Sequence, residues 1–186
     1  KEVNIAVFIS GNGSNLENLI KFSQKKLNFK IVLVISNNSK AKGLNFAKRY
    51  KIKKKIIDYS NLKIAEKKIF ENLEKNEIQL ICLAGFMKIL SKHFIKNYKG
   101  KIINIHPSLL PKYKGLNTHQ RAIDNNEKYS GCTVHYVSSK LDSGKIILQK
   151  RVKIFKTDTV KKLAKRVLKQ EHSLYPKALN KILTSL

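Results

Sequence analysis

Three scarcities limit the classes of protein to which this 186-residue chain can belong. No apolar run approaches the roughly eighteen residues that a membrane-spanning helix needs. Only two cysteines occur, Cys82 and Cys132, without a CxxC spacing, so we expect neither a zinc site nor a disulfide framework, as suits a reducing cytosol. The strand-like run Val3–Ile9 begins almost at once, with no visible signal peptide, which favours a soluble cytoplasmic protein.

Acidic residues are also scarce, since 12 Asp and Glu stand against 39 Lys and Arg, for a net charge of +27. Such a charge favours a polyanionic partner. However, only four of the basic residues are arginine, the residue best suited to bidentate recognition of bases and phosphates. The lysines are spread along the chain rather than gathered in one arm. We therefore expect a positive field that attracts small anionic substrates, and no specific nucleic-acid partner.

Apolar runs that alternate with helical patterns predict an α/β fold. Two successive strands near the C-terminus, joined by a hairpin turn at 138–144, cannot form a βαβ unit. We expect a Rossmann-like, mostly parallel open sheet with flanking helices and a C-terminal antiparallel extension, in a single domain, residues 1–186. Expected strands are 3–9, 30–35, 52–57, 78–83, 101–105, 131–137 and 145–155, and expected helices are 16–22, 41–50, 62–76, 118–125 and a C-terminal helix capped by Thr157 or Asp158, with a kink or break at Tyr175–Pro176.

The stretch 102–115 is the most informative part of the chain. A buried strand ends there at His106-Pro107, because proline cannot donate to a sheet ladder. Asn104 and His106 are two residues apart and therefore point to one face of the strand, at the edge where open α/β sheets bind ligands. An amide and an imidazole that converge suit a developing oxyanion and a proton transfer. The alternative is that both side chains only satisfy buried backbone groups.

A glycine loop, Ser10–Asn15, follows the first strand and precedes the first helix. Gly11 and Gly13 allow close backbone approach, while Ser14 or Asn15 can cap the helix. The free N–H groups and the helix dipole then predict a phosphate site. The loop is neither the dinucleotide fingerprint nor a P-loop, and a capped turn without a ligand is the alternative.

Two further segments have an ordinary interpretation and a functional one. The apolar residues of 84–90, which follow a strand, are either core or the wall of a pocket for a flat aromatic ligand. Asp142, in the hairpin turn, is either a simple turn residue or part of a site.

Taken together, the sequence resembles the phosphoribosylglycinamide formyltransferase family of folate-dependent formyltransferases, over essentially the whole chain. The motifs that carry the resemblance, in the family's order, are Ser10–Leu16, Leu83–Leu90, Asn104–Pro111, Leu141–Gly144 and Gln170–His172. The resemblance implies the formyltransferase fold and, in purine biosynthesis, formyl transfer from 10-formyltetrahydrofolate to the amine of 5'-phosphoribosylglycinamide. It also implies no metal, no covalent enzyme intermediate, and a monomer or homodimer.

The resemblance further assigns the two halves of the domain, with mononucleotide and phosphate binding in residues 1–100 and catalysis with folate binding in residues 101–186. It implies catalytic roles for Asn104, His106 and Asp142; phosphate and ribose binding by Gly13, Ser14, Asn15 and Glu171; and folate binding by Met87, Lys88, Ile89, Leu90, Asn104, Val137, Ser138, Ser139, Lys140 and Leu141.

Three rival functions remain at this point. Methionyl-tRNA formyltransferase would explain the charge, but it needs a further tRNA-binding domain for which the chain has no residues left. Formyltetrahydrofolate deformylase, a hydrolase, carries a regulatory domain ahead of the first strand. A basic nucleic-acid-binding module is the third, and it predicts an affinity that falls steeply with salt but leaves the five motifs unexplained.

Overall fold

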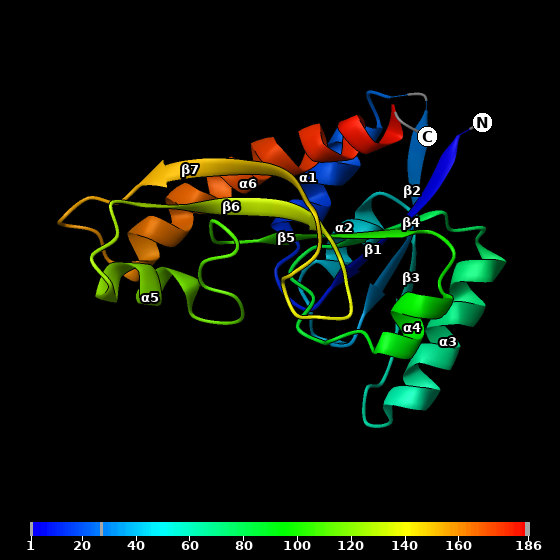
Figure 1. Cartoon of the computed structure of the whole chain (residues 1–186). Coiled ribbons are helices and arrows are strands. Elements are labelled where there is room, and N and C mark those ends of the chain that lie inside the picture. The colour runs from blue at the N-terminus through cyan, green and yellow to red at the C-terminus, as the bar shows by residue number, and fades with distance from the viewer. Residues whose placement is uncertain (1, 27, 185–186) are drawn as a thin grey trace. The chain divides into compact units, whose positions relative to one another are not determined.

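The computed structural model describes residues 2–26 and 28–184 (Figure 1). The chain divides into two compact units, Lys1–Ile103 and Asn104–Leu186. Over the described residues the sheet has seven strands in the order β3-β2-β1-β4-β5-β6-β7, mostly parallel, with an antiparallel pair at the C-terminal end. The predicted Rossmann-like sheet with an antiparallel extension is confirmed.

The first unit is built around β1 (Val3–Ile9), which is parallel to both β2 (Phe29–Ser36) and β4 (Leu80–Leu83). Ile5 to Ile9 are fully buried, which explains why this strand is a continuous apolar run. The edge strand β3 (Lys53–Ile56) is exposed along its length and rich in lysine, a composition that discourages pairing with another chain.

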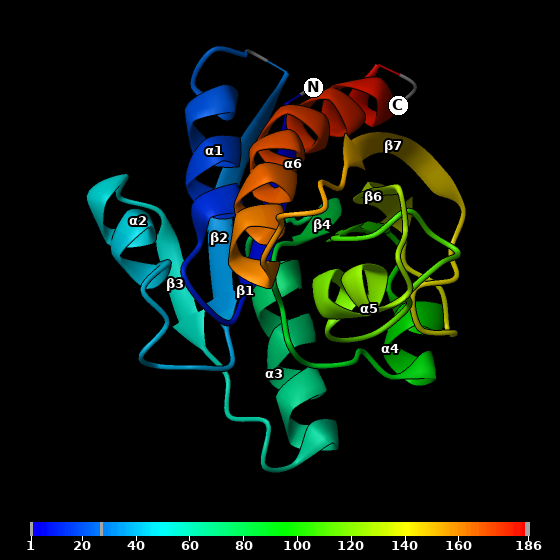
Figure 2. The same ribbon diagram turned by 90° about the vertical axis from the view of Figure 1, so that its left-hand side faces the viewer.

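Helices cover both faces of the first unit's strands. Figures 1 and 2 show α1 (Ser14–Ser23) and α2 (Leu44–Arg49) on one face, and α3 (Leu62–Lys75) and α4 (Lys92–Asn97) on the other. The helices α3 and α4 pack together through Phe70 and Phe94, whose ring centroids lie 4.6 Å apart. This contact helps to bury Phe94, which is 0% exposed.

The second unit contains the antiparallel pair. The strand β5 (Lys101–His106) runs into this unit, and β6 (Tyr129–Tyr136) pairs with β7 (Ile146–Lys153) in a register that sets Thr133 opposite Gln149. The long helix α6 (Val160–Leu183) packs against β6 and β7, and α5 (Thr118–Asp124) packs against α6 and β6 (Figure 1). The predicted hairpin is confirmed.

Both predicted helix caps are wrong. Gly13, with φ of 75°, is the N-cap of α1 and makes no side-chain cap, whereas Ser14 is already the first helical residue. Thr159 caps α6 by accepting a hydrogen bond from the Lys162 N–H at 3.2 Å. Asp158 instead accepts from the Phe155 N–H at 2.8 Å. Several residues near each helix start could cap it, and only the backbone path decides which one does.

The sequence predicted a kink or break at Tyr175–Pro176, and a break is wrong, because α6 continues through Pro176. A proline inside a helix removes one backbone hydrogen bond. Here the residues around it are deeply buried, with Tyr175 and Leu179 at 0% exposure, so packing of this face outweighs the lost bond. The short helix α4 was not predicted at all. It forms because Ser91 caps it at the Phe94 N–H, 3.0 Å away, and because Phe94 is fully buried.

Candidate active site

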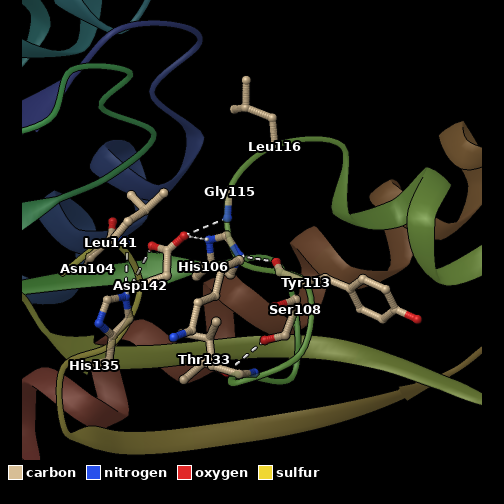
Figure 3. Close-up of polar contacts among 12 residues, drawn as sticks. Asn104, His106, Ser108, Tyr113, Gly115, Leu116, Thr133, His135, Leu141 and Asp142 are labelled. Atoms are coloured by element: carbon tan, nitrogen blue, oxygen red, sulfur yellow. Dashed lines mark hydrogen bonds and ion pairs between the residues drawn. The ribbon is translucent and has the colours of Figure 1, made fainter.

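The strand β5 ends in the second unit with two of the predicted catalytic side chains, Asn104 and His106 (Figure 3). His106 is 6% exposed, and its Nε2 lies 2.8 Å from the carbonyl oxygen of Tyr113. A carbonyl can only accept, so Nε2 carries a hydrogen and donates it to Tyr113. The other ring nitrogen, Nδ1, is therefore the one that remains for chemistry.

Asp142 faces that second nitrogen. Its Oδ2 lies 3.5 Å from His106 Nδ1 and also accepts the Gly115 N–H at 2.8 Å, and the carboxylate is 9% exposed. Asp142 holds a left-handed backbone conformation, with φ of 46°, which aspartate tolerates better than most residues. The turn thus places a carboxylate beside the imidazole of His106, as the prediction of a site residue at Asp142 requires.

Asn104 is held by His135, a residue of β6 that the sequence did not single out. The Asn104 Nδ2 group lies 3.2 Å from His135 Nε2, while His135 Nδ1 donates to the Tyr136 carbonyl at 2.9 Å. With the proton on Nδ1, Nε2 accepts from the Asn104 amide, which uses one of its two N–H bonds. Asn104 therefore keeps a second N–H for another acceptor.

Burial is the main cause that lowers the pKa of His135 below its ordinary value, and the nearby charge of His106 lowers it further. The Tyr136 carbonyl and Asp142 oppose this, with Asp142 Oδ1 3.9 Å from His135 Nε2. The net effect favours the neutral ring that the hydrogen bond from Asn104 requires. Figure 3 shows Asp142 between the two imidazoles.

The turn that supplies the Tyr113 carbonyl is tied to the antiparallel strands. Thr133 Oγ1 donates to the Ser108 carbonyl at 2.7 Å and accepts from the Leu110 N–H at 3.1 Å. Gln149 donates to the Leu110 carbonyl at 2.7 Å. These bonds fix the turn after His106 against β6 and β7, so the acceptor of the His106 proton is held in place.

The predicted phosphate residues Gly13, Ser14 and Asn15 lie at the N-terminus of α1, in the first unit. The N-cap residue, Gly13, makes no side-chain cap. A Cβ atom on Gly13 would lie 2.5 Å from the Gly43 Cα, and the Gly43 N–H donates to the Gly11 carbonyl at 3.0 Å. Gly43, which the sequence did not single out, therefore fixes the glycine loop by packing against Gly13 and by its hydrogen bond to Gly11.

The segment 84–90, also in the first unit, divides between core and surface. Leu90 is buried, and Phe86 packs edge-on against Phe8 with centroids 5.4 Å apart. Met87 and Ile89 are 64% and 69% exposed. The Lys88 Nζ lies 5.9 Å from the centre of the Tyr59 ring. Met87 and Ile89 therefore lie on the surface. Leu90 belongs to the core and Phe86 is half-buried, so the segment is neither wholly core nor wholly surface.

The remaining predicted site residues lie in the second unit. Glu171, on α6, is 8% exposed. Burial, followed by the charge of Glu171, raises the pKa of Cys132 to about 12. The predicted folate loop, Val137 to Leu141, connects β6 to β7, and the Ser138 hydroxyl donates to the Lys140 carbonyl at 3.1 Å. Leu141 is 53% exposed at the tip of this loop.

Within residues 2–26 and 28–184, no cluster of three or more His, Cys, Asp or Glu side chains is arranged to hold a metal ion. None of the described helices is both long and apolar enough to span a membrane.

Comparison with known proteins gives a consistent result. Residues 3–179 match the family model described as formyl transferase. Over 176 residues the chain is 43% identical to the phosphoribosylglycinamide formyltransferase of Haemophilus influenzae, covering 92% of this chain and 83% of that protein. It is 44% identical over 182 residues to the trifunctional purine biosynthetic protein adenosine-3 of Gallus gallus, covering 96% of this chain but only 18% of that protein. The crystal structure of phosphoribosylglycinamide formyltransferase from Anaplasma phagocytophilum superposes with a TM-score of 0.94 at 44% identity, over 100% of this chain and 89% of that one.

Proposed function

Because the chain belongs to the formyl transferase family, we propose that it transfers a formyl group from 10-formyltetrahydrofolate to the amine of 5'-phosphoribosylglycinamide. The observation that carries the proposal is the buried pair of His106 and Asp142, with Asn104 held by His135 beside them. The relatives named phosphoribosylglycinamide formyltransferase, which the chain covers over most of their length, support this choice of acceptor. The reaction would belong to purine biosynthesis, and Cys82 and Cys132, both buried and neither in a disulfide, fit a reducing cytoplasm.

The proposed reaction needs no nucleophilic side chain, because an uncharged amine is already a nucleophile. Its lone pair attacks the formyl carbon, and the carbonyl electrons move to the oxygen. The bond between the formyl carbon and N10 of the folate then breaks. One proton leaves the amine nitrogen and one is gained by N10, so the protein must stabilise an oxyanion and move one proton.

Each of the three catalytic residues fits one of these tasks. The second N–H of Asn104 would donate to the oxyanion. His106 would exchange its proton at Nδ1, because Nε2 is bonded to the Tyr113 carbonyl. Asp142 would bind the Nδ1–H when His106 is charged and pass protons on through water. No step requires a covalent link between substrate and protein.

We assign the substrate phosphate to Gly13, Ser14 and Asn15 and the ribose to Glu171. The N-terminus of α1 supports the phosphate assignment, since the N–H groups and the dipole of a helix favour an anion there. Folate would bind the segment Met87–Leu90 and the loop Val137–Leu141. The exposed Met87 and Ile89 side chains fit a flat, largely apolar ring system.

An acceptor panel tests the proposal. The purified chain is mixed with 10-formyltetrahydrofolate and either glycinamide ribonucleotide, charged initiator tRNA or water, and loss of the formyl group from the folate is followed. We expect turnover with the ribonucleotide only, abolished in His106→Ala. Turnover with tRNA or water would overturn the choice of acceptor, and no turnover with any of the three would overturn the proposed activity.

A further inference from the structure

Ser10 joins three loops of the first unit that follow β1, β2 and β4. Its N–H donates to the Gly85 carbonyl at 3.2 Å, and its carbonyl accepts from the Asn38 side-chain amide at 3.2 Å. Its hydroxyl oxygen accepts the Met87 N–H at 2.8 Å and donates to Asn37 Oδ1 at 2.5 Å. Ser10 is only 9% exposed, so both its backbone groups and its hydroxyl serve protein contacts.

The direction of the hydroxyl bond is fixed by its partners. Met87 offers an N–H, so the Ser10 oxygen must accept there, and the hydroxyl hydrogen is left for Asn37. Both bonds depend on the same atom, and alanine would remove both at once. Ser10 is also the first residue of the glycine loop. A displacement of the Met87 backbone would therefore also displace that loop.

The other end of the apolar segment is anchored in a similar way. Glu66 is buried at 6% exposure, and it accepts the Ser91 N–H at 2.9 Å and also binds the Ser91 hydroxyl. The segment 84–90 is thus fixed at Ser10 and at Glu66, while Met87 and Ile89 between the anchors are exposed. Loops that are fixed before binding lose less conformational freedom when a ligand arrives.

We propose that Ser10 is a positioning residue. It holds the rest of the glycine loop, residues 11–15, and the apolar segment 84–90 in one fixed arrangement, so that both substrates meet preformed surfaces. The inference rests on the proposed function for the identity of the two ligands. Ser10 itself touches neither ligand. Its loss therefore affects the binding of both substrates, through two loops, rather than the chemical step.

Kinetics of three variants test the inference. Ser10→Ala is expected to raise KM for the ribonucleotide and for the folate, each by about tenfold, with a smaller change in kcat, as for lost hydrogen bonds to buried groups. Ser10→Thr, which keeps the hydroxyl, is expected to restore most of the affinity. Ser91→Ala is the matched control, because it loosens the far end of the apolar segment and removes the cap of α4 but leaves the bonds of Ser10 intact, and it is expected to raise KM for folate alone.

Hydrogen exchange in the absence of substrates separates this inference from the proposed function. In Ser10→Ala we expect faster exchange of the Met87 amide and of amides in residues 11–15. Ser23→Ala removes a hydroxyl bond within α1, to the Ile20 carbonyl, and should leave both segments unchanged. If the wild type turns over but Ser10→Ala alters neither exchange nor both KM values, the inference is wrong and the function stands. If exchange responds but the wild type shows no activity, the proposed function is wrong and the role of Ser10 in fixing the loops stands.

Discussion

At the residue scale, the two nitrogens of His106 have different partners, which fixes the atom at which a proton can move. Nε2 donates to a backbone carbonyl that the Thr133 bonds hold in place, whereas Nδ1 faces Asp142. We therefore expect the proposed chemistry to depend on the charge of Asp142 and not only on the presence of an imidazole.

Asp142→Asn tests that dependence. Asparagine keeps an oxygen that can accept the Gly115 N–H and tolerates the positive φ, so we expect a normal fold and a midpoint of thermal unfolding within a few degrees of the wild type. Without the charge, kcat is expected to fall on the order of 10²–10³. Steady-state kinetics and a thermal melt measure both. A kcat close to that of the wild type would remove Asp142 from the catalytic residues.

We expect His135 to act through Asn104, which it contacts, and a pair of variants isolates this effect. His135→Leu fills similar space but cannot accept from the Asn104 amide, and we expect kcat to fall about tenfold with little change in KM, the effect of one lost neutral hydrogen bond. His135→Gln keeps an acceptor and is expected to be faster than His135→Leu. Equal kcat in the two variants would show that the amide needs no partner.

Two histidines, His135 and His119, are expected to make the stability of the protein depend on pH. Burial lowers the pKa of His135, and it lowers the pKa of His119 with a smaller effect from the charge of His106. As pH falls through about 6.5, the unfolded chain gains protons at both positions before the native protein does, so the free energy of unfolding falls. We expect a lower urea midpoint at about pH 5.5 than at about pH 7.5. The free energy of unfolding should change by at most about 1.4 kcal/mol per pH unit for each proton.

Two substitutions check the origin of that slope. His135→Gln removes one of the two imidazoles whose pKa is lowered and is expected to flatten the dependence of the free energy of unfolding on pH. The exposed His93→Gln serves as the control and should leave it as in the wild type. A slope that is the same in all three proteins would assign the pH dependence to other groups.

At the scale of elements, the glycine loop is shaped by a second element, α2, as well as by its own sequence. A Cβ atom on Gly43 would lie 2.5 Å from Ile9 Cδ1 and 2.9 Å from the Gly13 Cα. Gly43→Ala is therefore expected to destabilise the protein by about 1–3 kcal/mol and to raise KM for the ribonucleotide. Gly11→Ala is the steric control for stability, because nothing lies within 4 Å of its added Cβ. Urea unfolding compares them, and equal midpoints would contradict the packing argument.

Local sequence patterns predict those elements whose burial is uniform along the chain. The strand Val3–Ile9 was predicted with its observed bounds, because burial on both faces leaves a continuous apolar run. The helix cap at Thr159 and the uninterrupted Pro176 were missed, since each depends on the backbone path or on packing with distant residues. In the same way, Asn104, His106 and Asp142 could be proposed from motifs, whereas His135 and Ser10 could not. Their bonds join residues 31 and 77 positions apart, which no periodicity reports.

At the scale of the whole molecule, the net charge of +27 is spread over a family fold whose proposed substrates are both anions. A positive field raises the rate at which anions reach a site, and salt screens it, with a Debye length of about 30 Å at 0.01 M and about 8 Å at 0.15 M. We expect kcat/KM for the ribonucleotide to fall several-fold over that range of ionic strength, with kcat nearly unchanged. A neutral osmolyte at matched osmolarity is the control. A kcat/KM that does not respond to salt would show that the lysines play no part in substrate capture.

The most direct test of the proposed formyl transfer follows the formyl carbon itself. Protein in excess is mixed with 10-formyltetrahydrofolate labelled with ¹³C at the formyl group and with glycinamide ribonucleotide, and a single turnover is quenched and resolved by NMR and mass spectrometry. We predict that the label appears on the amine nitrogen of the ribonucleotide, with none on the protein at any time. In Asn104→Ala the rate of this transfer is expected to fall by a factor on the order of 10²–10³. Label recovered as formate, or on a side chain of the protein, would contradict direct transfer to the amine.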